Sequence, residues 1–218
     1  MTSMRKLFDI NNPVMRLLAR VVDLIILNTL FILTSLGIVT IGASFCALQT
    51  SIQKLLRHTS GSLVRDYFRI FRENFKNATI AWLGILALAL ILFLDFRLIG
   101  RLPIVAEFFM GAAAIILSIV TGVVAVYIFA LIGRYENPLK TSLRNIAVLS
   151  LQNLFQTLFL LVYNGFIIYF TFTSPAALLT MIYILTFGGF AFINLGSGVM
   201  IKQVFDKIEK TQNNKRET

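Results

Sequence analysis

The sequence predicts an all-α fold, a multi-pass transmembrane helical bundle. The strongest indication is a run of 57 consecutive uncharged residues between Arg144 and Lys202. A helix needs about 20 mostly apolar residues to cross a bilayer, so this run has room for two spans and a turn. The composition agrees, since 57% of the 218 residues are hydrophobic, 14% are charged and the mean hydropathy is +0.82. We expect a single integral membrane domain over residues 1–218.

The first uncharged run covers residues 24–53 and allows two interpretations. It forms one long helix, or it forms two short helices that turn between Gly37 and Gly42. The residues between these glycines are largely β-branched, and this pattern disfavours a helix. The second interpretation places spans at about 17–36 and 43–58.

The later spans follow from three further uncharged runs. Residues 77–94 and 108–133 each suit one helix. The long C-terminal run divides at Pro175, because proline ends a helical run. These later spans are predicted at about 78–96, 105–133, 146–171 and 176–200, and a cytoplasmic tail follows over 202–218.

The positions of lysine and arginine favour one interpretation of the first run. With six spans, 18 of the 20 cations fall on one side of the membrane, and only Arg97 and Arg101 fall on the other. With five spans, the best orientation gives 14 cations against 6. Short cytoplasmic loops concentrate Lys and Arg, which favours six spans as three hairpins with both termini in the cytoplasm.

Residues 62–76 form the most patterned polar segment. Aromatic and basic side chains recur on different faces at helical spacing, which predicts a cytoplasmic interfacial amphipathic helix. Three interpretations remain open: the helix lies among anionic headgroups, its rings pack as ordinary core, or it docks a partner. The aromatic positions are Tyr67, Phe68, Phe71 and Phe75, and the basic positions are Arg65, Arg69, Arg72 and Lys76.

Asp23 is the only candidate for a functional ionisable group inside a predicted span, because Asp95 and Glu107 lie at the outer rim; it falls close to the cytoplasmic end of the first span. Arg20 lies three residues before it, at a spacing that allows a structural ion pair on one helix face. Ionisable groups inside a membrane often mark a transport path, so a functional role for Asp23 is the alternative.

Uncharged polar residues are more plentiful in the predicted spans. One interpretation is that they form hydrogen bonds between packed helices. The other is that they line a polar cavity for a small solute. The residues concerned are Asn28, Gln152, Asn153, Gln156, Asn164 and Asn194.

The sequence offers little that could support catalysis. It has no glycine-rich phosphate loop, and one histidine (His58) with one cysteine (Cys46) cannot form a zinc site. We therefore expect no catalytic, cofactor-binding or metal-binding residues, and no enzyme activity. The net charge of +10 comes from cations that flank the apolar runs, which fits contact with a lipid bilayer and its anionic headgroups rather than with nucleic acid.

Five blocks of the sequence carry a resemblance to a known family, and they are Asn12–Arg16, Asp23–Asn28, Ile38–Ser44, Val64–Arg69 and Glu73–Ala78. They resemble the YesL-like family of bacterial membrane proteins, whose domain has no known function. The resemblance is close over residues 8–95. It implies a bacterial plasma-membrane protein. Relatives are often encoded near carbohydrate uptake systems, which implies an accessory role in sugar import or its sensing.

Two functions from different classes remain. The first is a non-catalytic accessory or regulatory partner of a membrane complex, linked by the resemblance to a carbohydrate transporter. The second is a small-solute channel or uniporter, with a polar cavity lined by the asparagines and glutamines named above.

Overall fold

The computed structural model describes residues 13–59, 61–98, 101, 103–135 and 139–217, with only the backbone of residues 13, 208 and 210–217. These residues form helices and no strand. In chain order the elements are α2 (Pro13–Thr34), α3 (Ile41–Leu56), α4 (Leu63–Leu98), α5 (Ile104–Tyr135), α6 (Leu139–Gln152), α7 (Leu154–Phe172), α8 (Pro175–Ile184), the π-helical turn η1 (Leu185–Gly189) and α9 (Phe190–Glu217).

Five helical segments of the described chain are long and apolar enough to cross a membrane, which confirms the all-α class and indicates a membrane protein. The segments are Val14–Thr34, Leu63–Leu98, Ile104–Tyr135, Leu154–Phe172 and Pro175–Lys207. Helix α3 is not among them. It has 16 residues, so its length is about 24 Å, against about 30 Å for the hydrocarbon core of a bilayer. The arrangement of six spans as three hairpins therefore stays a prediction.

The helix is interrupted between α2 and α3, in the glycine-flanked segment where the sequence predicts a turn. Helix α2 ends at Thr34 and α3 begins at Ile41. Two carbonyl groups of this turn accept hydrogen bonds from side chains of α4. Trp82 Nε1 donates to the carbonyl of Ile38 at 3.0 Å, and Thr79 Oγ1 donates to that of Val39 at 3.3 Å. The turn thus satisfies part of its backbone within the protein, as irregular chain in an apolar environment must.

The predicted interfacial helix and the span that follows it form one element. Helix α4 runs without a break for 36 residues, and this corresponds to about 54 Å. The predicted C-terminal tail is likewise part of a helix, because α9 continues to Glu217.

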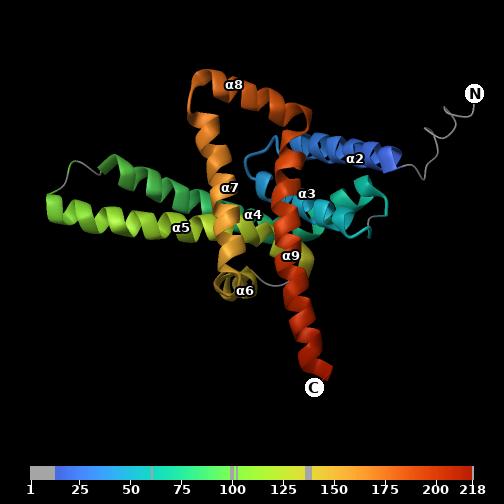
Figure 1. Cartoon of the computed structure of the whole chain (residues 1–218). Coiled ribbons are helices and arrows are strands. Elements are labelled where there is room, and N and C mark those ends of the chain that lie inside the picture. Colours follow the sequence, from blue (N-terminus) through green and yellow to red (C-terminus); the bar gives the residue numbers. More distant parts are fainter. Residues whose placement is uncertain (1–12, 60, 99–100, 102, 136–138, 218) are drawn as a thin grey trace, which may run out of the picture.

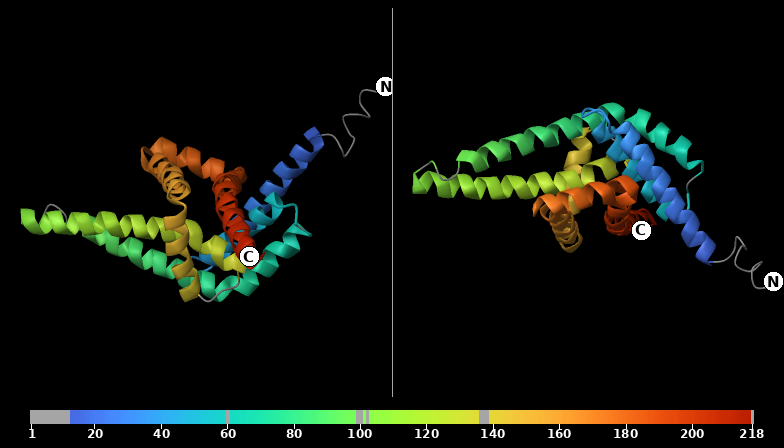
Figure 2. Two further views of the ribbon diagram at one scale, coloured as in Figure 1. Left: turned by 60° about the horizontal axis from the view of Figure 1, so that its bottom comes forward. Right: turned by 90° about the horizontal axis from the view of Figure 1, so that it is seen from above.

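The α4–α5 hairpin extends to one side of the molecule, and it lies crosswise to α7 and α9 (Figures 1 and 2). Helix α8 joins α7 to η1 at one end of these two helices, and α6 precedes α7 at the other end. Membrane-spanning helices are tilted by up to about 40° from the bilayer normal. The hairpin and the α7–α9 pair can therefore span one bilayer together only if they tilt in opposite directions.

Helix α3 lies at the centre of the molecule and packs against α2, α4, α5 and α9. Every residue from Gly42 to Gln53 is buried except Phe45, which is partly buried. Gly42 lets α3 approach α4 closely, because a Cβ atom there would lie 2.4 Å from the Ala78 carbonyl oxygen and 2.5 Å from Trp82 Cβ. The core of the protein is thus built around a helix with almost no exposed surface.

A buried cation joins α5 to α9. The Arg134 guanidinium is 7% exposed and lies 2.6 Å from a carboxylate oxygen of Glu209 and 3.8 Å from one of Asp206. Its central carbon also lies 4.6 Å from the centre of the Phe205 ring. Two carboxylates and an aromatic face compensate the charge, and they hold the second half of α9 on the end of α5.

Candidate functional site

A cleft of about 470 Å³ lies beside the central helix, with walls from α3, α4, α5, α7 and α9. No charged residue is among the described residues that line it. Its polar groups are carboxamides and hydroxyls, which both donate and accept hydrogen bonds. The polar lining residues are Gln49, Ser118, Asn164, Asn194 and Ser197.

Gln49 is the polar residue of the cleft with an open hydrogen-bonding position. Its side chain is buried, with 6% of the residue exposed. Its Nε2 donates to Asn194 Oδ1 at 3.4 Å, and Asn194 Nδ2 donates to the Phe190 carbonyl at 2.8 Å. The Gln49 Oε1 atom has no hydrogen-bond partner. A buried acceptor without a donor costs about 1–3 kcal/mol, so a donor that entered the cleft would relieve a real deficit.

A second polar pair lies on the α7 and α9 walls. Asn164 Nδ2 donates to the Leu160 carbonyl at 2.8 Å and lies 3.4 Å from Ser197 Oγ. Ser197 is buried, and both residues face the same cleft as Gln49. The pair of Gln49 and Asn194 and the pair of Asn164 and Ser197 therefore give the cleft polar groups on the α3, α7 and α9 walls.

The other walls are aromatic and aliphatic. Phe45 and Phe129 lie with ring centres 5.6 Å apart, and Trp82 stands on the α4 side. The hydrogen bond from Trp82 Nε1 to the Ile38 carbonyl fixes the indole in its position. A few polar groups on a mostly apolar wall are typical of sites for small molecules.

The predicted cavity residues divide into two groups. Asn164 and Asn194 line the cleft. The other four do not, and they are not brought together. Gln152 is exposed, Gln156 is partly buried, and Asn153 is buried with its Nδ2 donating to the Leu149 carbonyl at 3.1 Å. Sequence reasoning missed Gln49, Ser118, Ser197 and the aromatic walls, although an amide inside the uncharged run 24–53 was a usable signal for Gln49.

Asn28 has a different role, because it holds the irregular turn η1. Its Nδ2 donates to the carbonyls of Leu185 and Thr186 at 3.0 and 3.1 Å, and its Oδ1 accepts from the Ala191 amide at 3.2 Å. Within η1, Gly188 has φ of +151°, which side chains rarely permit. One side chain thus replaces the helical hydrogen bonds that the turn loses.

The Arg20 side chain contacts His58 rather than Asp23. One guanidinium nitrogen lies 3.2 Å from Nδ1 and 3.0 Å from Nε2 of His58. Among the described residues, Asp23 has no ion pair within 4.0 Å, so the predicted pair of Arg20 and Asp23 is not formed in this structure. His58 itself has φ of +57° and ends α3, where the Thr59 amide donates to the Lys54 carbonyl at 3.1 Å.

The basic face of α4 is exposed, and its aromatic face is divided. Arg65, Arg69, Arg72 and Lys76 are all exposed. Tyr67 is buried and lies 2.8 Å from Thr34 Oγ1, and Phe71 packs against both core clusters. Phe68 and Phe75 remain 41% and 36% exposed. Two of the four rings are therefore core, and two are available at the surface.

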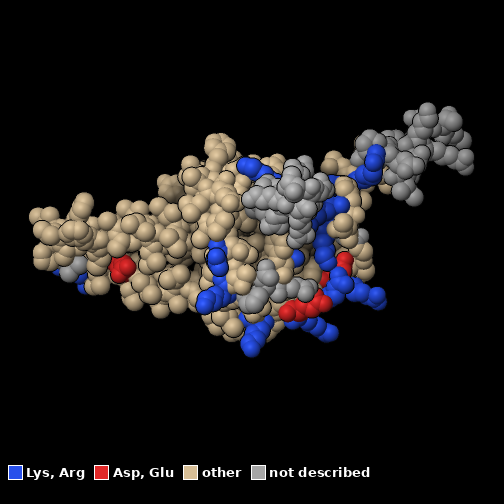
Figure 3. Space-filling view, turned by 90° about the horizontal axis from the view of Figure 1, so that it is seen from below, with Lys and Arg blue, Asp and Glu red and all other residues tan. Residues whose placement is uncertain are grey.

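Basic side chains are concentrated away from the α4–α5 arm. In Figure 3, Lys and Arg gather over the half of the molecule opposite the tip of this hairpin, and most of the arm is free of charge. Arg97 and Arg101 are the cations near the tip. On this face the two groups of cations are thus separated along the molecule, and their assignment to opposite sides of a membrane stays a prediction.

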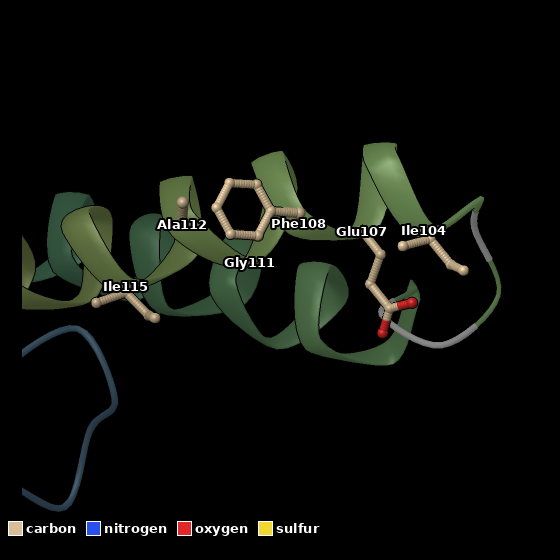
Figure 4. Close-up of a pocket in the computed structure, with 6 residues that line it drawn as sticks. All are labelled: Ile104, Glu107, Phe108, Gly111, Ala112 and Ile115. Carbon is tan, nitrogen blue, oxygen red and sulfur yellow. The ribbon is translucent and has the colours of Figure 1, made fainter.

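A shallower hollow lies along the outer part of α5 (Figure 4). All six of its lining residues belong to this one helix, from Ile104 to Ile115. Glu107 is its only ionisable group. Among the described residues, no three His, Cys, Asp or Glu side chains gather so that they could hold a metal ion.

Comparison with known proteins gives one match. Residues 24–96 match a family described as "Protein of unknown function, DUF624", which is about a third of the chain. The matched segment contains the second half of α2, all of α3 and nearly all of α4. It overlaps four of the five blocks that resemble the YesL-like family, and that finer name stays a prediction. No curated protein and no solved structure matches the chain.

Proposed function

We propose that this protein is a non-catalytic accessory or regulatory partner of a complex in the bacterial plasma membrane. The proposal includes six spans with both termini in the cytoplasm. The observation that carries it is the exposed surface formed by Arg65, Arg69, Arg72 and Lys76 with Phe68 and Phe75 on the first part of α4. We call these six residues the α4 surface.

The length of α4 explains why this surface suits a partner. A helix of about 54 Å exceeds the hydrocarbon core of about 30 Å, so roughly four turns of α4 extend beyond it. The α4 surface lies in the polar first part of the helix, and the apolar part follows it. With this extension outside the hydrocarbon core, the α4 surface is accessible to a partner in the cytoplasm.

The charge of the α4 surface defines the chemistry of the partner. Among the described residues, one ion pair engages these four cations, between Arg69 and Asp66 at 2.6 Å, and Glu73 is the other acidic residue of this segment. The complementary surface is therefore acidic, with an apolar patch that receives the two phenylalanine rings. The resemblance to proteins encoded near carbohydrate uptake systems suggests the cytoplasmic face of such a transporter as this partner.

Affinity purification in mild detergent tests the proposal. The wild-type protein should recover a membrane partner, and the variant Arg65→Glu/Arg69→Glu/Arg72→Glu should lose it. The matched control is Arg97→Glu/Arg101→Glu, which reverses charge at the other end of α4 and should keep the partner. Normal recovery of the partner by the α4 variant contradicts docking. Loss of accumulation with the partner retained assigns the surface to lipid headgroups instead.

The polar cleft favours a second function, a small-solute channel or uniporter. Its uncharged polar groups lie inside a protein whose helices are apolar enough to span a membrane. Purified protein in liposomes should then release a trapped neutral solute without an energy source. Liposomes that stay impermeable to sugars and smaller polyols contradict this function and leave the docking proposal untouched.

A further inference from the structure

We propose that the polar cleft is a binding site for a neutral solute that presents a hydroxyl or amide N–H donor beside an apolar face. The donor would bind the Gln49 amide oxygen, and the apolar face would lie between Phe45, Trp82 and Phe129. The proposal requires binding and not passage through the protein, so it depends on neither docking at the α4 surface nor permeation.

The open acceptor determines the donor. Gln49 is held on one side by its Nε2 contact with Asn194, while its Oε1 is buried and unpartnered. Because the terminal torsion of glutamine is broad, a modest rotation can present this oxygen to the cleft. A ligand donor then completes a hydrogen bond that the protein leaves unmade. Ser197 adds a buried hydroxyl on the α9 wall.

The lining determines the charge and the apolar face. No described lining residue could compensate a charge on the ligand, and burial of an unpaired ion is very costly. The ring pair of Phe45 and Phe129 and the fixed indole of Trp82 offer flat apolar walls. A volume of about 470 Å³ holds a ring-sized molecule together with several waters, each of which occupies about 30 Å³ of liquid.

Trp82 makes the site directly measurable, because it is the only tryptophan in the chain. A bromine atom quenches tryptophan fluorescence on contact. The probes are therefore 2-bromocyclohexanol, which has a donor, and 1-bromo-2-methoxycyclohexane, which has a similar ring but no donor. Quenching is titrated with the full-length protein in mild detergent. A third probe, 2-bromocyclohexanecarboxylate, tests the exclusion of charge.

Quenching of Trp82 should be half-maximal at about a 3- to 10-fold lower concentration of the alcohol than of the ether, as expected for one net hydrogen bond. The carboxylate should quench more weakly than either. Gln49→Met removes the acceptor at similar size and should abolish the preference for the alcohol. Gln53→Met is the matched control, because Gln53 is a buried glutamine one turn further along α3 that does not line the cleft. It should keep the preference.

A double variant, Trp82→Phe/Phe93→Trp, controls for probe that dissolves in the detergent. Phe93 is 54% exposed on the same helix, so a tryptophan there reports partition alone and should show no preference. Equal quenching of Trp82 by alcohol and ether contradicts the proposal, and so does a preference that survives Gln49→Met. If Gln49→Met does not accumulate, the alcohol–ether ratio of the wild-type protein is compared with that of the double variant, and equal ratios overturn the proposed site.

Discussion

Asn28 shows what a single amide can do in an apolar helix. It is 1% exposed, and its side chain forms three hydrogen bonds that hold a π-helical turn more than 150 residues away in the chain. An irregular turn among apolar helices needs such a partner, because no water is available there to satisfy its backbone.

We predict that Asn28→Leu destabilises the protein by about 2–4 kcal/mol, because it leaves two carbonyls and one amide of the η1 region unpaired. The measurement is thermal or denaturant unfolding in detergent. Thr29→Val is the control, since Thr29 is exposed and bonds only to the Ile25 carbonyl of its own helix. If Asn28→Leu lowers the free energy of unfolding no more than Thr29→Val does, η1 does not depend on the hydrogen bonds of Asn28.

At the scale of the elements, the α3–α4 contact rests on a glycine. Gly42 lies in the first turn of α3 beside the backbone of Ala78. A side chain there would meet the Ala78 carbonyl oxygen, which is part of a helix backbone and cannot rotate away. Gly84 lies on α4 with open space around it. A side chain would therefore clash with α4 at Gly42, and it would find free space at Gly84.

We predict that Gly42→Ala destabilises the protein by about 1–3 kcal/mol, because the two helices must move apart. Gly84→Ala should instead be neutral or stabilising by up to about 1 kcal/mol, as alanine favours a helix interior. Unfolding of both variants under the same conditions gives the comparison. Similar effects for the two would contradict the close approach of α3 to α4.

Helices were easier to predict than their environment. The glycine-flanked turn, Pro175 as the start of α8 and the periodic face of α4 follow from local chemistry, so the sequence predicts them well. The fusion of residues 62–76 with the next span did not follow from polarity, because a change in polarity does not break a helix. Likewise, Asn164 and Asn194 meet Gln49 only through the packing of α3, α7 and α9, and spacing along the chain carries no such information.

For the molecule as a whole, the direction of α7 and α9 decides which helices span the membrane. They lie crosswise to the α4–α5 hairpin (Figure 2), whereas the charge pattern predicts that all of these helices span the membrane. Arg101 at the tip of the hairpin and Ser174 between α7 and α8 mark the two ends that should be external.

We predict that Arg101→Cys and Ser174→Cys are both labelled in intact cells by a membrane-impermeant maleimide, while Leu63→Cys is labelled only after the cells are opened. The native Cys46 is buried, and Cys46→Ala removes any background. Labelling of Arg101→Cys but not of Ser174→Cys would mean that α7 and α9 do not span the membrane together with the hairpin. A protected Arg101→Cys would invert the proposed topology.

The enclosure of α3 has a consequence for biosynthesis. Membrane insertion selects segments by their own affinity for lipid, and helix association follows once they are in the bilayer. Helix α3 carries Gln49, Thr50, Ser51 and Gln53 close together, all of them shielded by other helices. Helix α3 can reach its packed position among α2, α4, α5 and α9 only when these neighbours have been synthesised. It therefore leaves the ribosome early but packs late.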